Sequence, residues 1–147
     1  MDRSRLALLP IAALLVAACS SGGGTSSPAA SSAAAQTRIE VDLADTLRFE
    51  PGSMTVPAGV PVTFVVTNGG VLDHEFYLGD EGMQAHHEEE MLEMGGMGHD
   101  EPGGIAVDPG ETKELTYTFE KPGMTLVGCH VAGHYAGGMK ATIAVVE

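Results

Sequence analysis

Short runs of alternating apolar and polar residues, separated by strong turn signals, constrain the fold of this chain more than any other feature. Alternation with a period of two indicates β-strands that bury one face. The residues expected to face inward are Ile39, Val41 and Leu43, then Val62, Phe64 and Val66, then Leu115, Tyr117 and Phe119, and finally Met139, Ala141, Ile143 and Val145. Pro-Gly, Ala-Gly and Asn-Gly pairs between these runs predict tight turns. Several short strands at this spacing favour an all-β sandwich or a barrel, and we predict the sandwich.

The chain begins with the pattern of an export signal over residues 1–18. Arg3 and Arg5 precede an uncharged apolar run that is too short to cross a membrane as a helix. The run ends in the letters LVAAC, which resemble the lipobox of bacterial lipoproteins. This resemblance implies that Cys19 carries lipid, palmitate included, and forms the mature N-terminus. Cleavage of the signal without lipid attachment, which would leave Cys19 as a free thiol, is the alternative.

Residues 19–37 consist almost entirely of serine, glycine and alanine, and they lack apolar periodicity. Such a segment gains too little from burial to order itself, so we expect a flexible tether behind Cys19. Residues 38–147 are long enough for one modest core and are expected to form a single domain. Together these features predict an exported protein, anchored by lipid to a bacterial membrane, whose domain faces the periplasm or the cell exterior.

The charge balance restricts the partners of this protein. The chain has 20 acidic residues against 7 lysines and arginines, a formal net charge of −13. Binding to nucleic acid requires clustered basic side chains, so this balance excludes a nucleic-acid partner. Acidic residues instead steer partners that carry basic docking surfaces, which makes association rates sensitive to salt. We expect the protein itself to be a monomer.

A glycine-rich stretch near the C-terminus contains the residues that point to chemistry. It places Cys129, His134 and Met139 in the pattern C-x4-H-x4-M, and His74 lies 55 residues before the cysteine. Thiolate and thioether sulfur suit Cu(I) and imidazole suits Cu(II), so two histidines, one cysteine and a weak axial methionine are a compromise that both states tolerate. A glycine-rich loop lets three ligands fold back onto one ion, which a regular strand cannot do. The sequence therefore predicts one redox-active copper ion as the cofactor.

With these residues in place, the chain after Arg38 resembles the cupredoxins, the family of small type 1 blue-copper proteins. The spacing of the ligand loop is most similar to that of the rusticyanin branch. The resemblance implies a Greek-key β-sandwich in which His74 and His134 bind copper through Nδ1. It further implies that Cys129 is the thiolate ligand and Met139 the axial ligand. The outer edge of His134 would be the port for electrons.

One position departs from the family pattern. Many members carry Asn or Ser directly after the upstream histidine, where the side chain ties the two ligand loops together. This chain carries Glu75 there. The departure bears on the hydrogen bonds around the copper, and hence on its reduction potential, and it leaves the ligands themselves unchanged.

Each of these residues also has a simpler interpretation. A buried thiol is often inert, and a lone methionine or histidine often belongs to the core. If lipid occupies Cys19, however, Cys129 has no disulfide partner, and metal binding gives an exported, unpaired thiol a reason. His130 is too close to Cys129 to share a trigonal site with it, so we expect His130 to be a surface histidine. An exported β domain without metal is the remaining alternative.

A segment rich in methionine and histidine, residues 83–99, interrupts the strand pattern between His74 and the ligand loop. Good helix formers over residues 84–94, followed by two glycines, predict a short helix. On such a helix four residues would share one face, namely Met83, His87, Met91 and Met94. Their thioethers would favour Cu(I) at a second copper site. A helix that packs this stripe onto the sandwich, or a mobile acidic loop, is the alternative.

Two functions follow from these features, and neither is enzymatic. The leading hypothesis is a membrane-tethered carrier that passes single electrons between redox proteins outside the cytoplasm. It would dock through the small residues of segment 132–138 around His134. The alternative is a copper-sequestering or copper-tolerance protein that uses residues 83–99 as a second copper site. An enzyme is not expected, because copper reductases and oxidases need a further open copper site between two such domains.

Overall fold

The computed structural model describes residues 37–147, and these form nine β-strands and one helix. The strands are β1 (Thr37–Ala44), β2 (Arg48–Glu50), β3 (Ser53–Pro57), β4 (Pro61–Asn68), β5 (His74–Gly79), β6 (Gly104–Val107), β7 (Thr112–Thr118), β8 (Gly123–Gly128) and β9 (Lys140–Val146), and the helix is α1 (Glu81–Glu93). The predicted export signal and the lipid attachment predicted at Cys19 lie outside the described residues. Strand β1 begins at Thr37, one residue before the predicted start of the domain.

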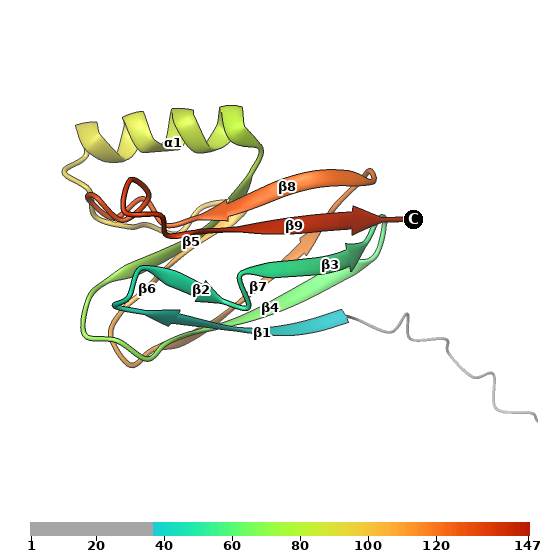
Figure 1. Cartoon of the computed structure of the whole chain (residues 1–147), viewed down its shortest axis with the longest axis horizontal. Helices are drawn as coiled ribbons and strands as arrows, with labels where there is room; N and C mark the ends of the chain where they lie inside the picture. The colour runs from blue at the N-terminus through green and yellow to red at the C-terminus, as the bar shows by residue number, and fades with distance from the viewer. Residues whose placement is uncertain (1–36) are drawn as a thin grey trace, which may run out of the picture. The chain divides into compact units, whose positions relative to one another are not determined.

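The strands form two sheets, with the orders β2-β1-β4-β7 and β3-β9-β8-β5-β6. Strand β1 runs parallel to β4 and β3 runs parallel to β9, whereas the other neighbours are antiparallel. Neither sheet follows the order of the sequence, because the chain crosses repeatedly from one sheet to the other, as Greek-key connections require. Figure 1 shows the two layers of strands. The predicted all-β sandwich is therefore confirmed.

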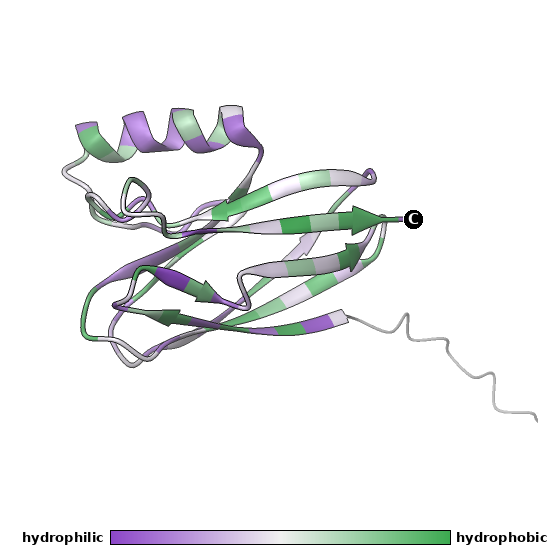
Figure 2. Cartoon of the chain, in the orientation of Figure 1, coloured by the Kyte–Doolittle hydropathy of each residue, from purple (hydrophilic) through white to green (hydrophobic). Residues whose placement is uncertain are grey.

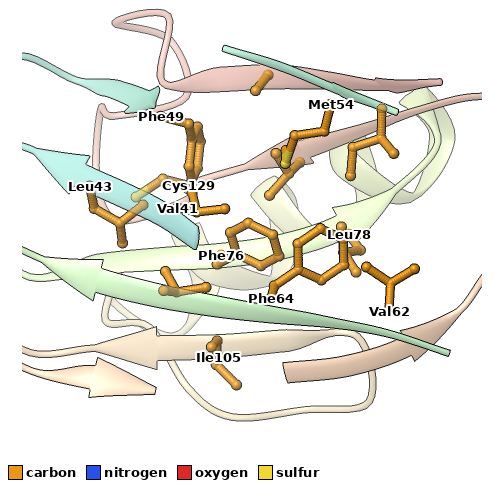
Figure 3. Packing of buried hydrophobic residues seen from close by; sticks show 14 of the residues in the cluster. Val41, Leu43, Phe49, Met54, Val62, Phe64, Phe76, Leu78, Ile105 and Cys129 are labelled. Carbon is orange, nitrogen blue, oxygen red and sulfur yellow. The ribbon is translucent and has the colours of Figure 1, made fainter. Parts of the chain in front are cut away.

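The core between the sheets consists mainly of residues that the alternation predicts. Those that are buried include Val41, Leu43, Val62, Phe64, Val66, Ala141, Ile143 and Val145. Phe76 of β5 packs among them, with its ring centroid 5.1 Å from that of Phe64 and 5.9 Å from that of Phe49 (Figure 3). Cys129 belongs to the same cluster of buried residues (Figure 3). The apolar core thus extends as far as the predicted copper thiolate.

Two of the predicted strands differ in detail from the structure. Leu115 and Tyr117 are only partly buried, because β7 is an edge strand of its sheet. Met139 lies in the loop before β9 rather than in the strand, although its side chain is fully buried. The inward pattern of the last strand therefore continues one residue beyond its hydrogen-bonded start.

Helix α1 follows β5 and occupies much of the methionine- and histidine-rich segment. Asp80 precedes the helix and accepts a hydrogen bond from the backbone N–H of Met83 at 2.9 Å, which satisfies one of the free N–H groups of the first turn. The helix ends before Gly95 and Gly96, whose φ values of 88° and 73° favour glycine. The predicted helix is confirmed, with a start three residues earlier. Figure 2 shows that α1 is largely hydrophilic, and no helix within residues 37–147 has the length and apolar character needed to cross a bilayer.

Candidate metal centre

The structure brings the side chains of His74, Cys129 and His134 together. The Sγ atom of Cys129 lies 3.4 Å from Nδ1 of His134 and 3.9 Å from Nδ1 of His74. The three ligand atoms all lie within 4.8 Å of one another, which places them within reach of one metal ion. Both histidines turn Nδ1 toward the sulfur, the nitrogen that the cupredoxin resemblance implies. His74 and Cys129 are fully buried, and His134 is partly exposed.

Two strand ends account for this convergence. His74 is the first residue of β5, and Cys129 directly follows the last residue of β8. The two strands pair antiparallel, with Tyr77 opposite Gly128. The beginning of β5 and the end of β8 therefore lie at the same end of the sheet, although 55 residues separate His74 from Cys129 in the sequence. The pairing of these strands brings together what the sequence places far apart.

The loop of residues 129–139 folds back on itself between β8 and β9. The backbone N–H of Cys129 donates to the carbonyl of Met139 at 3.1 Å, and that of Met139 donates to the carbonyl of His134 at 3.0 Å. Gly138 has a φ of 93°, a value that favours glycine, where the loop turns back toward β9. Backbone hydrogen bonds thus hold Met139 against both neighbouring ligand residues. Its role as the axial ligand stays a prediction.

Glu75 stands where the family pattern has Asn or Ser, and it joins the two ligand segments in two ways. Its backbone N–H donates a hydrogen bond to Sγ of Cys129 at 3.3 Å. Its fully buried carboxylate accepts a hydrogen bond from the backbone N–H of His130, also at 3.3 Å. The carboxylate also lies 3.1 Å from Nε2 of His87 on helix α1. Glu75 therefore ties the ligand segments together and adds a link to the helix.

Asp45, in the turn between β1 and β2, supports His74 from outside the core. Its carboxylate accepts hydrogen bonds from the backbone N–H groups of Val71 and Leu72, at 3.0 and 3.2 Å, and these two residues lie just before β5. The hydrogen bond from Val71 is the main reason that the pKa of Asp45 falls below its usual range. The carboxylate also lies 3.6 Å from Nε2 of His74. Asp45 does not stand out from the sequence alone, because its only local signal is an aspartate in a turn between two short strands.

Burial sets the protonation of the three candidate ligands. It raises the pKa of the Cys129 thiol to about 12. Burial also lowers the pKa of His74, where His134 acts in the same direction, and it lowers the pKa of His134. At neutral pH the site therefore offers two neutral imidazoles and a thiol that loses its proton to an incoming metal ion. One sulfur and two imidazole nitrogens within reach of one ion, in apolar surroundings, fit copper.

His130 is not the surface histidine that the sequence analysis expects, so that expectation is wrong. Only 2% of its surface is exposed. Its Nε2–H donates to the side-chain oxygen of Gln84 at 2.7 Å, its Nδ1 contacts the carboxylate of Glu88, and its ring stacks on Tyr135. Gln84 and Glu88 lie one turn apart on α1, so the helix covers the histidine. Gly128 permits this close approach, because a Cβ atom there would lie 2.4 Å from the Gln84 side-chain oxygen and 2.9 Å from the His130 ring.

The four residues of the predicted second copper site differ in their surroundings. Helix α1 turns Gln84, His87 and Met91 inward. Met83 and Met94 are 46% and 52% exposed and lie toward the two ends of the helix. Two of the four residues, His87 and Met91, are thus buried, and Met83 and Met94 are exposed, because the polar Gln84 and His87 occupy part of the buried face of the helix. Joint binding of copper by Met83, His87, Met91 and Met94 stays a prediction.

A β-sandwich whose strand ends gather one cysteine and two histidines around a single point defines the class of the cupredoxins. The model of the copper-binding proteins of the plastocyanin/azurin family matches residues 35–146. The chain belongs to this family, and copper is its cofactor. The resemblance drawn from the four spaced residues is thereby confirmed, while the likeness of the loop to the rusticyanin branch stays a prediction.

Two relatives named copper-resistant cuproprotein CopI are similar to most of the chain. The protein from Rubrivivax gelatinosus is 38% identical over 111 residues, which cover 76% of this chain and 67% of the relative. The protein from Pseudomonas aeruginosa is 36% identical over 140 residues, which cover 76% of this chain and 77% of the relative.

Solved structures of auracyanins share the fold. The dithionite-reduced auracyanin from Roseiflexus castenholzii has a TM-score of 0.68 at 25% identity, over 76% of this chain and 98% of its own. Auracyanin A, a "blue" copper protein from Chloroflexus aurantiacus, has a TM-score of 0.65 at 27% identity, over 76% of this chain and 99% of its own.

Proposed function

We propose that this protein binds copper outside the cytoplasm and protects the cell against an excess of the metal. The observation that carries the proposal is the His74–Cys129–His134 cluster in a chain that resembles two proteins named for copper resistance. This was the alternative to electron transfer in the sequence analysis, and the names of the relatives favour it. The proposal assigns binding rather than catalysis to the site.

The residues around the cluster suit the retention of copper. Copper held there would supply one-electron redox chemistry. Cys129 belongs to the buried apolar core, so a bound ion would be shielded from water and from external thiols on the side of the sulfur. Glu75 and Asp45 support the cluster from two sides, and such supporting contacts commonly contribute 10- to 100-fold to metal affinity, as an order of magnitude.

The N-terminal pattern supports a place for this protein at a membrane outside the cytoplasm. An export signal over residues 1–18 and a lipid on Cys19 would hold the domain near the surface where copper enters. The serine-, glycine- and alanine-rich tether would leave the domain free to reach copper in the surrounding compartment. Labelling with a radioactive fatty acid tests the anchor, because the label should be lost in Cys19→Ala.

A growth experiment tests the role in tolerance. The full chain is expressed in a bacterium from which its own copper-resistant cuproprotein has been deleted, and growth is followed as copper is raised. We expect the unaltered protein to restore growth and Cys129→Ser to fail. His86→Gln is the matched control, because His86 is exposed on α1 and, among residues 37–147, pairs only with Glu90. Equal protection by Cys129→Ser, at equal protein levels, would show that the cluster does not account for tolerance.

A specific feature also favours electron transfer as a second candidate function. The partly exposed His134 lies in a loop whose exposed residues are small, including Ala132, Gly133, Ala136 and Gly137. Small residues let a partner approach the imidazole edge closely, as the docking prediction requires. The acidic charge of the chain would steer basic partners, so rates of electron exchange with a basic redox protein should fall as salt is raised. Rates that do not depend on salt would exclude this steering.

A further inference from the structure

A second cluster of ligand-type side chains lies between helix α1 and the sheet. Glu75 of β5, His87 of α1 and Glu101 before β6 bring their ligand atoms within 4.8 Å of one another. Glu75 and His87 are fully buried, and Glu101 is partly buried. Figure 1 shows α1 lying along the end of the sandwich that also carries the loop between β8 and β9. The cluster contains none of the three side chains of the first site.

The imidazole of His87 is fixed between two carboxylates. Its Nε2 lies 3.1 Å from both carboxylate oxygens of Glu75, and its Nδ1 lies 3.1 Å from Oε1 of Glu101 and 3.9 Å from Oε2 of Glu90. Tyr77 stacks on the ring, with centroids 3.9 Å apart and planes within 10°. The plane and position of the imidazole are therefore set before any ligand arrives.

Hydrogen bonds among the described residues leave part of this cluster unsatisfied. Nδ1 of His87 and Oε1 of Glu101 are both buried and have no hydrogen-bond partner within residues 37–147. They lie 3.1 Å apart, but they are not aligned as a donor and an acceptor. When Nε2–H donates to Glu75, Nδ1 turns a lone pair toward a carboxylate oxygen, and two acceptors repel at this distance. Buried polar atoms in native proteins almost always have a partner, and a cation bound by both would be one.

The surrounding charges point in the same direction. Within residues 37–147 neither Glu75 nor Glu101 forms an ion pair with a lysine or an arginine. His99 lies near the cluster, with its Nε2 3.8 Å from Oε1 of Glu101. Nδ1 of His99 is also buried without a partner in the described part of the chain. One buried and one partly buried carboxylate thus lie beside two histidines, with no lysine or arginine paired to either carboxylate among the described residues.

We propose that Glu75, His87 and Glu101 bind a second copper ion as Cu(II), with His99 in reach of the same ion. Imidazole nitrogen and carboxylate oxygen suit divalent transition metals, and among the first-row ions Cu(II) binds such donors most tightly. The site differs from the one predicted on the methionine stripe, because its donors are nitrogen and oxygen rather than thioether sulfur. The proposal does not rest on the role in copper tolerance.

Glu75 would connect the two sites. Its carboxylate belongs to the second cluster, while its backbone N–H donates to the sulfur of Cys129. A cation bound by the carboxylate would draw electron density toward itself and change the charge that Cys129 experiences. Binding of the second ion should therefore shift the visible thiolate-to-copper band of the first site without abolishing it.

Copper titration of the full chain, with its first site already loaded, tests the proposal. We expect the unaltered protein to bind one further Cu(II), with the wide EPR hyperfine splitting of nitrogen and oxygen ligands. Glu101→Gln and His87→Gln should each weaken this binding by about 10- to 100-fold or more. His86→Gln should leave it unchanged, which makes it the matched control because His86 and His87 are neighbours on the same helix. If His87→Gln does not fold, Glu101→Gln still decides, since Glu101 is only partly buried.

Any one of four results would overturn the proposal. One is that the unaltered protein binds no further Cu(II). Another is that Glu101→Gln binds the second ion as tightly as the unaltered protein does. Another is that the second ion is lost in the double variant Met83→Leu and Met94→Leu but kept in Glu101→Gln, because this would place the ion on the methionine stripe. The last is that an equal concentration of Zn(II) displaces the second ion, because this would exclude copper as the metal that the site prefers.

Discussion

The backbone N–H of Glu75 donates a hydrogen bond to the sulfur of Cys129 at 3.3 Å, across 54 residues of sequence. The buried carboxylate of the same residue accepts from the backbone of His130, so one residue joins the start of β5 to the ligand loop. A neutral asparagine or serine in this place would remove the carboxylate whose charge acts most strongly on Cys129. The charge of Glu75 therefore distinguishes the surroundings of this copper site from the family pattern.

Glu75→Gln should raise the reduction potential of the first copper site. The change keeps the shape and the backbone hydrogen bond but removes a negative charge that favours Cu(II) over Cu(I). Redox titration of protein loaded with one equivalent of copper measures the shift. Glu88→Gln is the control, because its effect on the charge at Cys129 is in the same direction but weaker. An unchanged or lower potential in Glu75→Gln would contradict this account.

Copper binding at neutral pH should release about one proton per ion. The raised pKa of Cys129, about 12, keeps the thiol protonated in the metal-free protein, and the lowered pKa values of His74 and His134 keep both imidazoles neutral. As the pH is lowered through the neutral range, the copper affinity should therefore fall about tenfold per pH unit. It should fall more steeply only below the usual histidine pKa, where the imidazoles also take up protons. Calorimetry in buffers of different ionisation enthalpy counts the protons. A release of two or three protons at pH 7 would contradict the lowered histidine pKa values.

Asp45→Ala should weaken copper binding at the first site by about 10- to 100-fold. The variant removes the contact to Nε2 of His74 and the hydrogen bonds that fix Val71 and Leu72 just before it. Competition with a copper chelator measures the affinity. Asp42→Ala removes an equal charge from an exposed position on β1 and should bind like the unaltered protein. If the two variants behave alike, the position of Asp45 does not matter.

Met139→Leu should retain a coloured copper site and raise its potential. Loss of a weak axial thioether favours Cu(I), while the three other ligands still hold the ion. The visible spectrum reports retention of the site, and redox titration reports the potential. A colourless variant, or one with an unchanged or lower potential, would be inconsistent with Met139 as the axial ligand.

Phe76→Ala should destabilise the domain by about 3–5 kcal/mol, because it leaves a cavity against the rings of Phe49 and Phe64, which belong to the facing sheet. Denaturant unfolding of the metal-free protein measures the free energy of unfolding. Val71→Ala, at an exposed position, should change it by no more than about 0.5 kcal/mol. A small loss in Phe76→Ala would mean that the core can close over the missing ring.

The strands and the helix could be predicted because local chemistry determines them. Alternating apolar residues such as Val62, Phe64 and Val66 indicate which face of a strand is buried. The two glycines after residue 94 indicate where the helix ends. The candidate ligands Cys129 and His134 could also be chosen from the spacing of cysteine, histidine and methionine in one loop, and the resemblance to the cupredoxins adds His74 upstream of it. The observed boundaries of these strands and of the helix differ from the predicted ones by only a few residues.

The surroundings of the copper site were decided by tertiary structure. Asp45 approaches His74 from a turn 29 residues away, and Glu75 meets His130 only because β5 and β8 pair. The burial of His130 and the second cluster at His87 depend on how helix α1 lies over the sheet. That contact is made by polar side chains, which leave no apolar periodicity in the sequence. A sequence by itself therefore predicts the candidate ligands of the copper, whereas the hydrogen bonds and charges around them require the packed fold, because they form between segments that only folding brings together.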